Sequence, residues 1–501
     1  MIRIRCILAF ALACSARLLM AAIPSPDSIM PVPPIQWLQP APTIGHAFGS
    51  SAHQQVPADL AAQGYREDEY LFGGQARIYD FVEGQANAVI RTLGRTGYVD
   101  RLLIRRPVDP ARFSGNVVLE VINSALDFDA LAIWPYMQGQ IMQNGDIWIG
   151  ITASPTGIRS LKSANPLRYA AMGFGPSPDR DCPASGPEVG AIFDILNQLG
   201  HLLRQPGDPL NPLRGLDVRA LIATGYSQGA MILATYTHAI APNLADGGFD
   251  GFISIAGIGG YALNNCEALT DFASRVLAPV SGGIPLMQVQ TTSETLLLPL
   301  GLPGESAHDQ SIGAPYRYYE VAGSGHLDRI LADHAPDAAD LLAAGGYDID
   351  LAIEGCHLAW PLSRFPAGYV YDNLLARMEA WIRHGTAPPP DQRFVLGGWL
   401  WPGRPIGGLR SPAVDVPLAD YFVGIGLTLQ THGGGFSAGI PCVLASIEHD
   451  YEPARLKMLY GSHRHYLEQV RLSVARLLAQ GYLTPSDGRA IIEQAAARRI
   501  P

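Results

Sequence analysis

Long apolar runs and clusters of basic residues are both missing from this chain of 501 residues. Beyond residue 23, no segment reaches the roughly eighteen uninterrupted apolar residues that a membrane-spanning helix needs. Lysine and arginine are scattered and the formal net charge is −10, so no surface is predicted to attract a phosphate backbone. These absences argue against a transmembrane span and against nucleic acid as a partner.

Charged residues are also scarce, at 16%, whereas hydrophobic residues make up 48%. Repeats and low-complexity stretches are absent. This composition excludes a disordered chain and favours a globular protein with a sizeable core. The length admits two or three average domains, or one large enzyme domain with insertions.

The first 23 residues have the order of an export signal. Arg3 and Arg5 give a basic start, an apolar stretch follows, and the small residues Ala21 and Ala22 precede the expected cleavage. Cys14 ends a stretch weakly similar to a lipoprotein cleavage box, so lipid anchoring is the less favoured alternative. We predict a secreted or periplasmic protein.

Cysteine is rare, and only four of the six cysteines lie beyond the signal. An even number in a chain that reaches an oxidising compartment predicts one or two disulfides, with three connectivities open and buried free thiols as the alternative. None has the close paired spacing of a zinc site, so no metal is predicted. The four are Cys182, Cys266, Cys356 and Cys442.

The most informative stretch is Gly225-Tyr226-Ser227-Gln228-Gly229. It joins an apolar run, 220–224, to a helix-forming run, 229–240, which is the setting of a nucleophile elbow: a strand, a sharp turn with a serine at its tip, and a helix. Strand and helix backbones approach so closely in such a turn that both glycines are needed. We predict Ser227 as a nucleophile, with helix capping as the alternative.

The same five-residue pattern recurs around Ser437, in Gly435-Phe436-Ser437-Ala438-Gly439. That copy is followed by Ile440 and Pro441 and another apolar run, with no long helix whose N-terminus could face an oxyanion. Context therefore favours Ser227 over Ser437.

Strand-like and helix-like segments alternate through the middle of the chain. This alternation predicts a mostly parallel, doubly wound sheet of about eight strands with lid-like insertions. The loops 153–187 and 331–366 are expected to determine substrate specificity. The predicted strands are 70–81, 98–104, 117–122, 147–152, 220–224, 251–256, 284–290 and 317–321.

The chain is predicted to hold one catalytic domain with flanking segments. After the signal, residues 24–60 form an extended, proline-containing lead-in, and residues 61–395 form the catalytic domain. Residues 396–501 form an extension packed on the core, ending in two helices, of which the last is capped by Thr484.

A serine nucleophile needs a histidine to accept its proton and an acid to hold that histidine. His326 is the one among thirteen histidines that comes just after a late strand and before a helix-like run. Glu294 is the first carboxylate in the loop after strand 284–290, and Asp271, after the preceding strand, is the alternative acid. The predicted triad is Ser227, His326 and Glu294.

The oxyanion of the reaction needs two backbone N–H donors. One is expected from Gln228, directly after the serine, and the other from the loop that follows an early strand. Strand 117–122 leads into Asn123 and Ser124, which are the candidates for the second donor.

With these residues placed, the sequence resembles a large group of exported proteins, the alpha/beta hydrolase domain family. The resemblance covers nearly the whole mature chain and implies an α/β-hydrolase fold, a serine nucleophile and an esterase-like activity. The sequence departs from the family pattern at Thr291-Thr292-Ser293-Glu294, where that pattern usually ends in aspartate. The segments that carry the resemblance are Gly64-Tyr65 with Glu67 and Glu69, Val121-Ile122-Asn123, Asn165-Pro166 with Arg168-Tyr169, Gly225 to Ala230, Glu320 to His326, Trp381 with Gly385 to Pro389, and Gly407 to Arg410.

The leading hypothesis is a carboxylic ester hydrolase that uses an acyl-enzyme, without metal or cofactor, on a small-molecule or polymeric ester. A lactonase, amidase or acyltransferase on the same triad is the second. The third is a non-catalytic member of the fold that only binds a ligand, and the intact serine and histidine argue against it.

Overall fold

A computed structural model describes most of the chain after the predicted signal. The described residues are 31–82, 89–179, 182, 185–244, 248–267, 283–297, 315–345, 360–395, 406–423 and 444–500.

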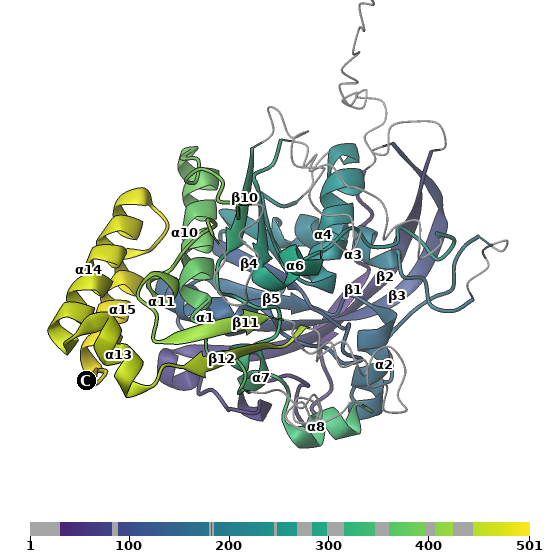
Figure 1. The fold of residues 1–501 in the computed structure, drawn as a ribbon. Helices are drawn as coiled ribbons and strands as arrows, with labels where there is room; N and C mark the ends of the chain where they lie inside the picture. The colour runs from purple at the N-terminus through teal and green to yellow at the C-terminus, as the bar shows by residue number, and fades with distance from the viewer. Residues whose placement is uncertain are drawn as a thin grey trace, which may run out of the picture.

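A ten-stranded sheet forms the centre of the molecule (Figure 1). Six neighbouring strands are parallel, in the order β5-β4-β7-β8-β9-β10, so the carboxyl ends of these strands meet at one edge. They are β4 (Asn116–Val121), β5 (Ile147–Ile151), β7 (Ala220–Tyr226), β8 (Gly251–Ile255), β9 (Leu286–Thr291) and β10 (Tyr316–Val321).

The other strands extend the sheet in antiparallel fashion. β3 (Ile90–Pro107) pairs with β5, and β2 (Tyr65–Phe81) pairs with β3 along its length. The short strands β1 (Trp37–Pro40) and β6 (Gly173–Phe174) pair with β2 and β3. All eight predicted strands are present; the two additional ones are too short to leave a periodic signal in the sequence.

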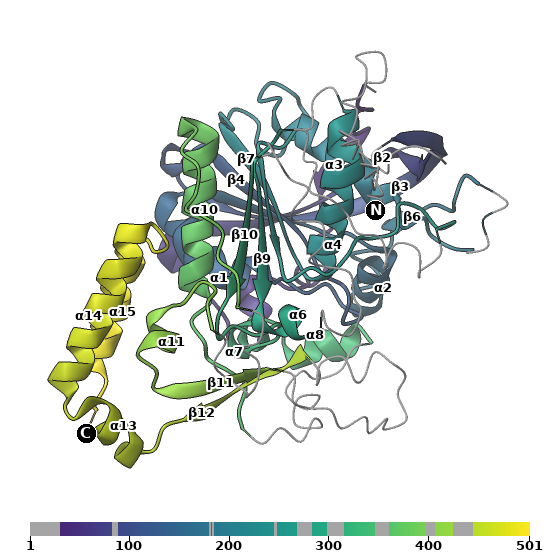
Figure 2. The same cartoon turned by 45° about the horizontal axis from the view of Figure 1, so that its top comes forward.

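Helices cover both faces of the sheet (Figure 2). α1 (Ile133–Asn144) and α10 (Gly368–His384) lie on one face, and α3 (Ala191–Leu203) and α4 (Gln228–Thr235) lie on the other. Neighbouring residues of β4 point to opposite faces: Leu119 is in the core below α3, and Val118 is in the core below α1. Burial on both faces explains why this strand reads as a continuous apolar run.

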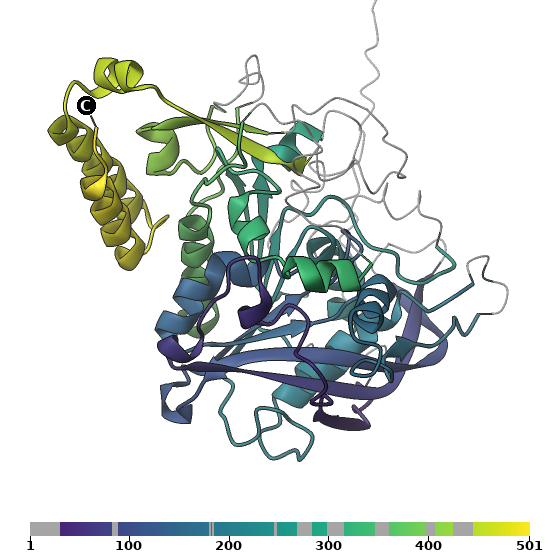
Figure 3. The ribbon, with the colours of Figure 1, turned by 90° about the horizontal axis from the view of Figure 1, so that it is seen from below.

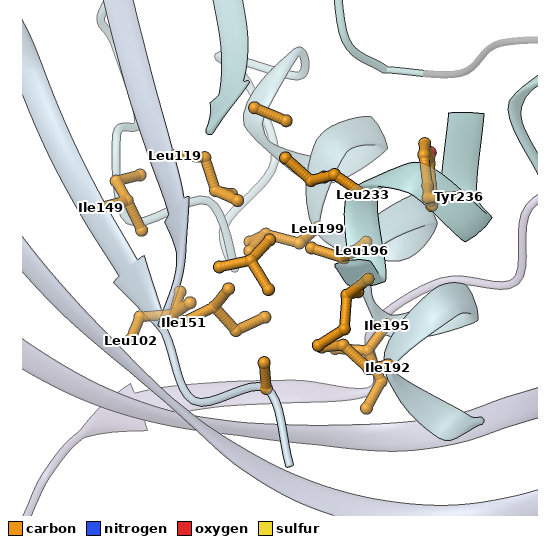
Figure 4. Close-up of a cluster of buried hydrophobic side chains, with 14 of the residues drawn as sticks. Leu102, Leu119, Ile149, Ile151, Ile192, Ile195, Leu196, Leu199, Leu233 and Tyr236 are labelled. Carbon is orange, nitrogen blue, oxygen red and sulfur yellow. The ribbon is translucent and has the colours of Figure 1, made fainter. Parts of the chain in front are cut away.

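Figure 4 shows the core below α3 and α4. Leucine and isoleucine side chains of β3, β4 and β5 pack there against one face of α3. The labelled residues are Leu102, Leu119, Ile149, Ile151, Ile192, Ile195, Leu196, Leu199, Leu233 and Tyr236, all buried.

The C-terminal part adds a small sheet, the short helix α11 (Pro412–Asp415) and three further helices among the described residues. β11 (Ala419–Val423) and β12 (Ser446–Asp450) pair antiparallel across the end of the large sheet where β9 and β10 finish (Figure 2 and Figure 3). After α13 (Pro453–Tyr460), α14 (His463–Gln480) and α15 (Pro485–Ala497) lie on the outer side of α10 (Figure 1). The two final helices and the Thr484 cap, which accepts the Asp487 N–H, agree with the sequence; the β11–β12 pair was not expected.

One disulfide, Cys182–Cys266, joins the segment before α3 to the segment after β8, with Cα atoms 4.7 Å apart. Cys356 and Cys442 lie outside the described residues. Within the described part of the chain, no helix has the length and apolar character to cross a membrane.

Candidate active site

Ser227 lies at a strained turn between β7 and α4. Its backbone has φ 54° and ψ −116°, a conformation that non-glycine residues rarely adopt. A Cβ on Gly225 would lie 2.4 Å from the carbonyl carbon of Gly229, and a Cβ on Gly229 would lie 2.2 Å from the Val121 oxygen. The two glycines are therefore required by the close approach of β7, α4 and β4, as the elbow predicts.

Glu294 and His326 come together at the carboxyl ends of β9 and β10. The His326 Nδ1 atom lies 2.5 Å from Glu294 Oε1, and the glutamate is fully buried. Its other oxygen accepts hydrogen bonds from the Thr291 backbone N–H, at 2.8 Å, and the Thr291 hydroxyl, at 2.6 Å. Glu294 occupies the first turn of α6 (Thr292–Leu297), not a loop as the sequence suggested.

The ionisation of Glu294 is set by two opposing effects. Burial favours the neutral acid, whereas the charge of His326 and hydrogen bonds from His326 and Thr291 favour the carboxylate. The favourable contacts prevail and hold the pKa of Glu294 below its ordinary value. An ionised carboxylate accepts the Nδ1–H of the imidazole and so leaves Nε2 free to accept a proton.

Two hydrogen bonds hold the backbone of His326. Its N–H donates to the Ser293 hydroxyl at 3.0 Å, and its carbonyl accepts the Tyr226 hydroxyl at 2.7 Å. The Tyr226 ring also meets the imidazole edge to face, with centroids 5.2 Å apart. Sequence reasoning did not identify this role for Tyr226, although its position next to Ser227 indicated that it would lie close to the catalytic residues.

Asp328, two residues after His326, is a second buried carboxyl beside the site. It caps α7 (Arg329–Asp333) by accepting the Leu331 N–H at 3.0 Å, and it also accepts a hydrogen bond from Tyr136. Burial raises the pKa of Asp328 to about 7.

The loop after β4 faces the elbow, and its backbone donors are already engaged. The N–H of Asn123 donates to Ala130 at 3.3 Å, and the N–H of Ser124 donates to the side-chain Oε1 of Gln228 at 3.0 Å. The carboxamide oxygen of Gln228 is thus the acceptor of the Ser124 N–H in this structure. For the Ser124 N–H to bind an oxyanion, that side chain must move away.

A cavity that is partly open to solvent contains both Ser227 and His326. Its other lining is almost entirely apolar, and it is contributed by the loop after β4, the α7 region and the C-terminal part. These residues are Asn123, Ala125, Leu126, Phe128, Ala130, Leu131, Ala132, Tyr226, Leu327, Leu331, Ala335 and Leu444.

The structure thus places Glu294 against His326, and His326 with Ser227 in one cavity, with Asn123 on its wall. Leu444 was missed by sequence reasoning because it lies more than a hundred residues from the histidine. It reaches the site through β12: the Leu327 N–H donates to the Leu444 carbonyl at 3.0 Å. The alternative acid Asp271 and the second serine Ser437 lie outside the described residues.

Several solved structures are similar in part. Esterase Est22 shares 13% identity, with 58% of this chain and 82% of that chain covered and a TM-score of 0.32. An arylesterase shares 12% identity over 55% of this chain and 83% of that chain, with a TM-score of 0.29. An esterase from the fungus Rhizomucor miehei shares 13% identity, with 52% of this chain and 78% of that chain covered and a TM-score of 0.26. No match was found among curated proteins.

The sequence model of the alpha/beta hydrolase domain matches residues 33–493, nearly the whole chain. This match confirms both the resemblance and the fold class predicted from the sequence. The chain belongs to the alpha/beta hydrolase domain family.

Proposed function

We propose that the protein is a serine hydrolase that cleaves a carboxylic ester through an acyl-enzyme, with Ser227, His326 and Glu294 as its triad. The observation that carries the proposal is the His326–Glu294 contact at 2.5 Å, with that histidine in the same cavity as the strained Ser227. A buried carboxylate that fixes the imidazole tautomer is what a serine nucleophile requires.

In this mechanism, His326 accepts the proton of Ser227 while the serine oxygen attacks the ester carbonyl. The Gln228 backbone N–H and one donor of the loop after β4 stabilise the oxyanion, with the substrate oxygen replacing the Gln228 side chain on Ser124. His326 then protonates the leaving alcohol, and a water molecule activated by the same imidazole releases the acid.

The cavity favours an ester with an uncharged, apolar acyl group. Its lining includes Leu126, Phe128, Leu131, Leu331 and Leu444, and His326 is its only ionisable group other than the Tyr226 phenol among the described lining residues. A charged acyl group would lose its hydration there without gaining a partner. Neutral esters should therefore be turned over much faster than esters of a dicarboxylic acid.

Mechanism-based labelling tests the proposal. A fluorophosphonate probe should label Ser227 alone, and Ser227→Ala should abolish both labelling and ester cleavage, a loss of several orders of magnitude. Ser437→Ala is the matched control and should retain both. Labelling that persists in Ser227→Ala and vanishes in Ser437→Ala would contradict the assignment.

Esters of graded acyl length, compared with matched lactones and amides, separate the ester hydrolase from the related activities. Transfer of the acyl group to an added alcohol would indicate an acyltransferase. A protein that binds such esters but takes no label would be a non-catalytic member of the family.

A further inference from the structure

The loop between β4 and α1, residues 123–130, carries a buried carboxylate near its end. The Asn123 and Ala130 backbones hydrogen-bond to each other and close the loop. That carboxylate, Asp129, is only 2% exposed, and its Oδ1 accepts the hydroxyl of Ser124, at the start of the loop, at 3.2 Å. Ser124 is therefore held on two sides, since its N–H donates to the Gln228 side chain.

The Ser124 hydroxyl is turned away from the cavity. Asn123 and Ala125, on either side of it, line the cavity, whereas the Ser124 residue is 1% exposed. A Cβ on Gly157 of α2 (Pro155–Ala164) would lie 2.5 Å from Asp129 Oδ1 and 2.7 Å from Ser124 Oγ. The glycine thus leaves the space in which these two side chains meet.

Asp129 belongs to a buried ion network with balanced charge. Its Oδ2 accepts hydrogen bonds from Thr152, at 2.6 Å, and from Arg101, at 3.3 Å. Arg101 also donates to Glu69 at 2.5 Å, and Glu69 accepts a second guanidinium, that of Arg168, at 2.6 Å. Two carboxylates and two guanidinium groups are thus buried together.

Buried ion networks are not in general the most stabilising way to fill a protein core. Apolar residues of similar volume often stabilise a protein as much as buried ion pairs do, whereas hydrogen-bonded ions fix direction and distance. Burial raises the pKa of Asp129, and Arg101 and the hydroxyl of Thr152 oppose that rise. Through Asp129, the network joins β2, β3 and the segment after α2 to the hydroxyl of Ser124, on the loop that faces the elbow.

We propose that Asp129 is a positioning residue, which acts through the Ser124 hydroxyl to hold the loop 123–130 at the distance from Ser227 that oxyanion binding requires. The effect of this role on catalysis rests on the proposed function. Asp129 touches no reacting atom. Its effect is to fix the Ser124 N–H, which is the loop donor nearest to the Gln228 side chain.

The test compares two variants that each remove one buried hydroxyl bonded to this network. Ser124→Ala removes the bond to Asp129 and keeps the backbone N–H. Tyr169→Phe removes a fully buried hydroxyl that donates to Glu69 at 2.8 Å and accepts the Phe48 N–H at 2.9 Å, and it changes no bond of the loop. Both should lower the melting temperature by similar amounts, because each leaves one buried polar atom unsatisfied, Asp129 Oδ1 or the Phe48 N–H.

Only Ser124→Ala should disturb the loop and the reaction. Hydrogen–deuterium exchange of the peptide covering 123–130 should become severalfold faster, and kcat should fall about ten- to hundredfold with KM within about twofold, since a displaced donor weakens only the transition state. In Tyr169→Phe, exchange of that peptide and kcat should stay within about twofold of wild type.

Equal loop exchange and equal kcat in the two variants would overturn the positioning role. If the wild-type protein neither takes a fluorophosphonate label nor cleaves esters, the proposed function fails by itself. The exchange comparison still decides in that case whether Asp129 holds the loop through Ser124.

Discussion

Thr291 determines how any substitute for Glu294 would be oriented. Its backbone N–H and its hydroxyl both donate to Oε2, and the hydroxyl is directed there because it accepts the Ser293 N–H at 3.1 Å. A backbone N–H can only donate. A glutamine at 294 would therefore place its oxygen toward Thr291 and its NH₂ group toward His326 Nδ1.

Glu294→Gln should for this reason reduce turnover by about a thousandfold or more with little change in KM. The NH₂ group would force the imidazole proton onto Nε2, where it blocks acceptance of the serine proton. Circular dichroism should show an intact fold, and steady-state kinetics with a chromogenic ester gives the rate. Asp271→Asn is the control and should be nearly silent; the reverse pattern would move the acid to position 271.

For single residues, the sequence could predict which ones lie at strand ends, but not the side-chain hydrogen bonds that hold them in place. Ser227, His326 and Glu294 follow from chain order, because parallel strands bring their carboxyl ends to one edge. The Tyr226 bond to the His326 carbonyl depends on side-chain direction across strands that are distant in sequence. The engagement of Ser124 by Gln228 depends on a rotamer, which no pattern encodes.

Among the secondary-structure elements, the interface of α10 and α15 buries two carboxyl groups. Asp372 of α10 and Asp487 of α15 are each 8% exposed. Burial, and secondly the charge of Asp487, raises the pKa of Asp372 to about 8. Since an unfolded aspartate titrates near 3.9, the folded protein binds an extra proton between about pH 4 and pH 8.

Asp372→Asn should therefore stabilise the protein at neutral and alkaline pH. In the wild type, Asp372 lowers the free energy of unfolding by an amount that grows as the pH rises from about 4 to about 8 and is constant above pH 8. Asparagine does not titrate, so the variant lacks this loss. Melting curves should show a gain of about 2 °C or more at pH 8 that vanishes near pH 4.

Glu493→Gln, which removes an exposed carboxylate from α15, is the matched control and should give no such pH-dependent gain. A pH-independent effect of Asp372→Asn would contradict the titration of Asp372 in this range.

Periodicity predicted the long elements well and the short ones poorly. α3, α10 and α14 carry apolar residues at helical spacing, and α14 and α15 are the two final helices that the sequence predicts. β11 and β12 have five residues each, with polar residues on both faces, and their register joins segments more than twenty residues apart. Their place at the site arises from backbone bonds to the His326 loop, such as the Ser446 N–H to the Leu327 carbonyl at 2.8 Å.

On the scale of the whole molecule, the Cys182–Cys266 bond joins segments 84 residues apart beside the start of α3. The same region is fixed by hydrogen bonds between Glu188 and the Asn265 N–H, at 2.8 Å, and between Asn265 and the Val189 N–H, at 3.1 Å. The sequence could predict only that some of four cysteines pair, because connectivity depends on which loops meet. A disulfide supports the proposal that the chain is exported to an oxidising compartment.

Loss of this crosslink should lower the free energy of unfolding by about 2 to 4 kcal/mol, because it closes a long loop in the unfolded chain. Denaturant titrations should show the same loss of free energy of unfolding in Cys182→Ser, Cys266→Ser and the double variant. Each of them removes the same bond, and the effects of coupled residues do not add. Peptide mapping without reductant should recover the two cysteines in one linked peptide from protein exported to an oxidising compartment. Four free thiols in that protein, or a double variant that loses twice as much as either single one, would contradict the crosslink.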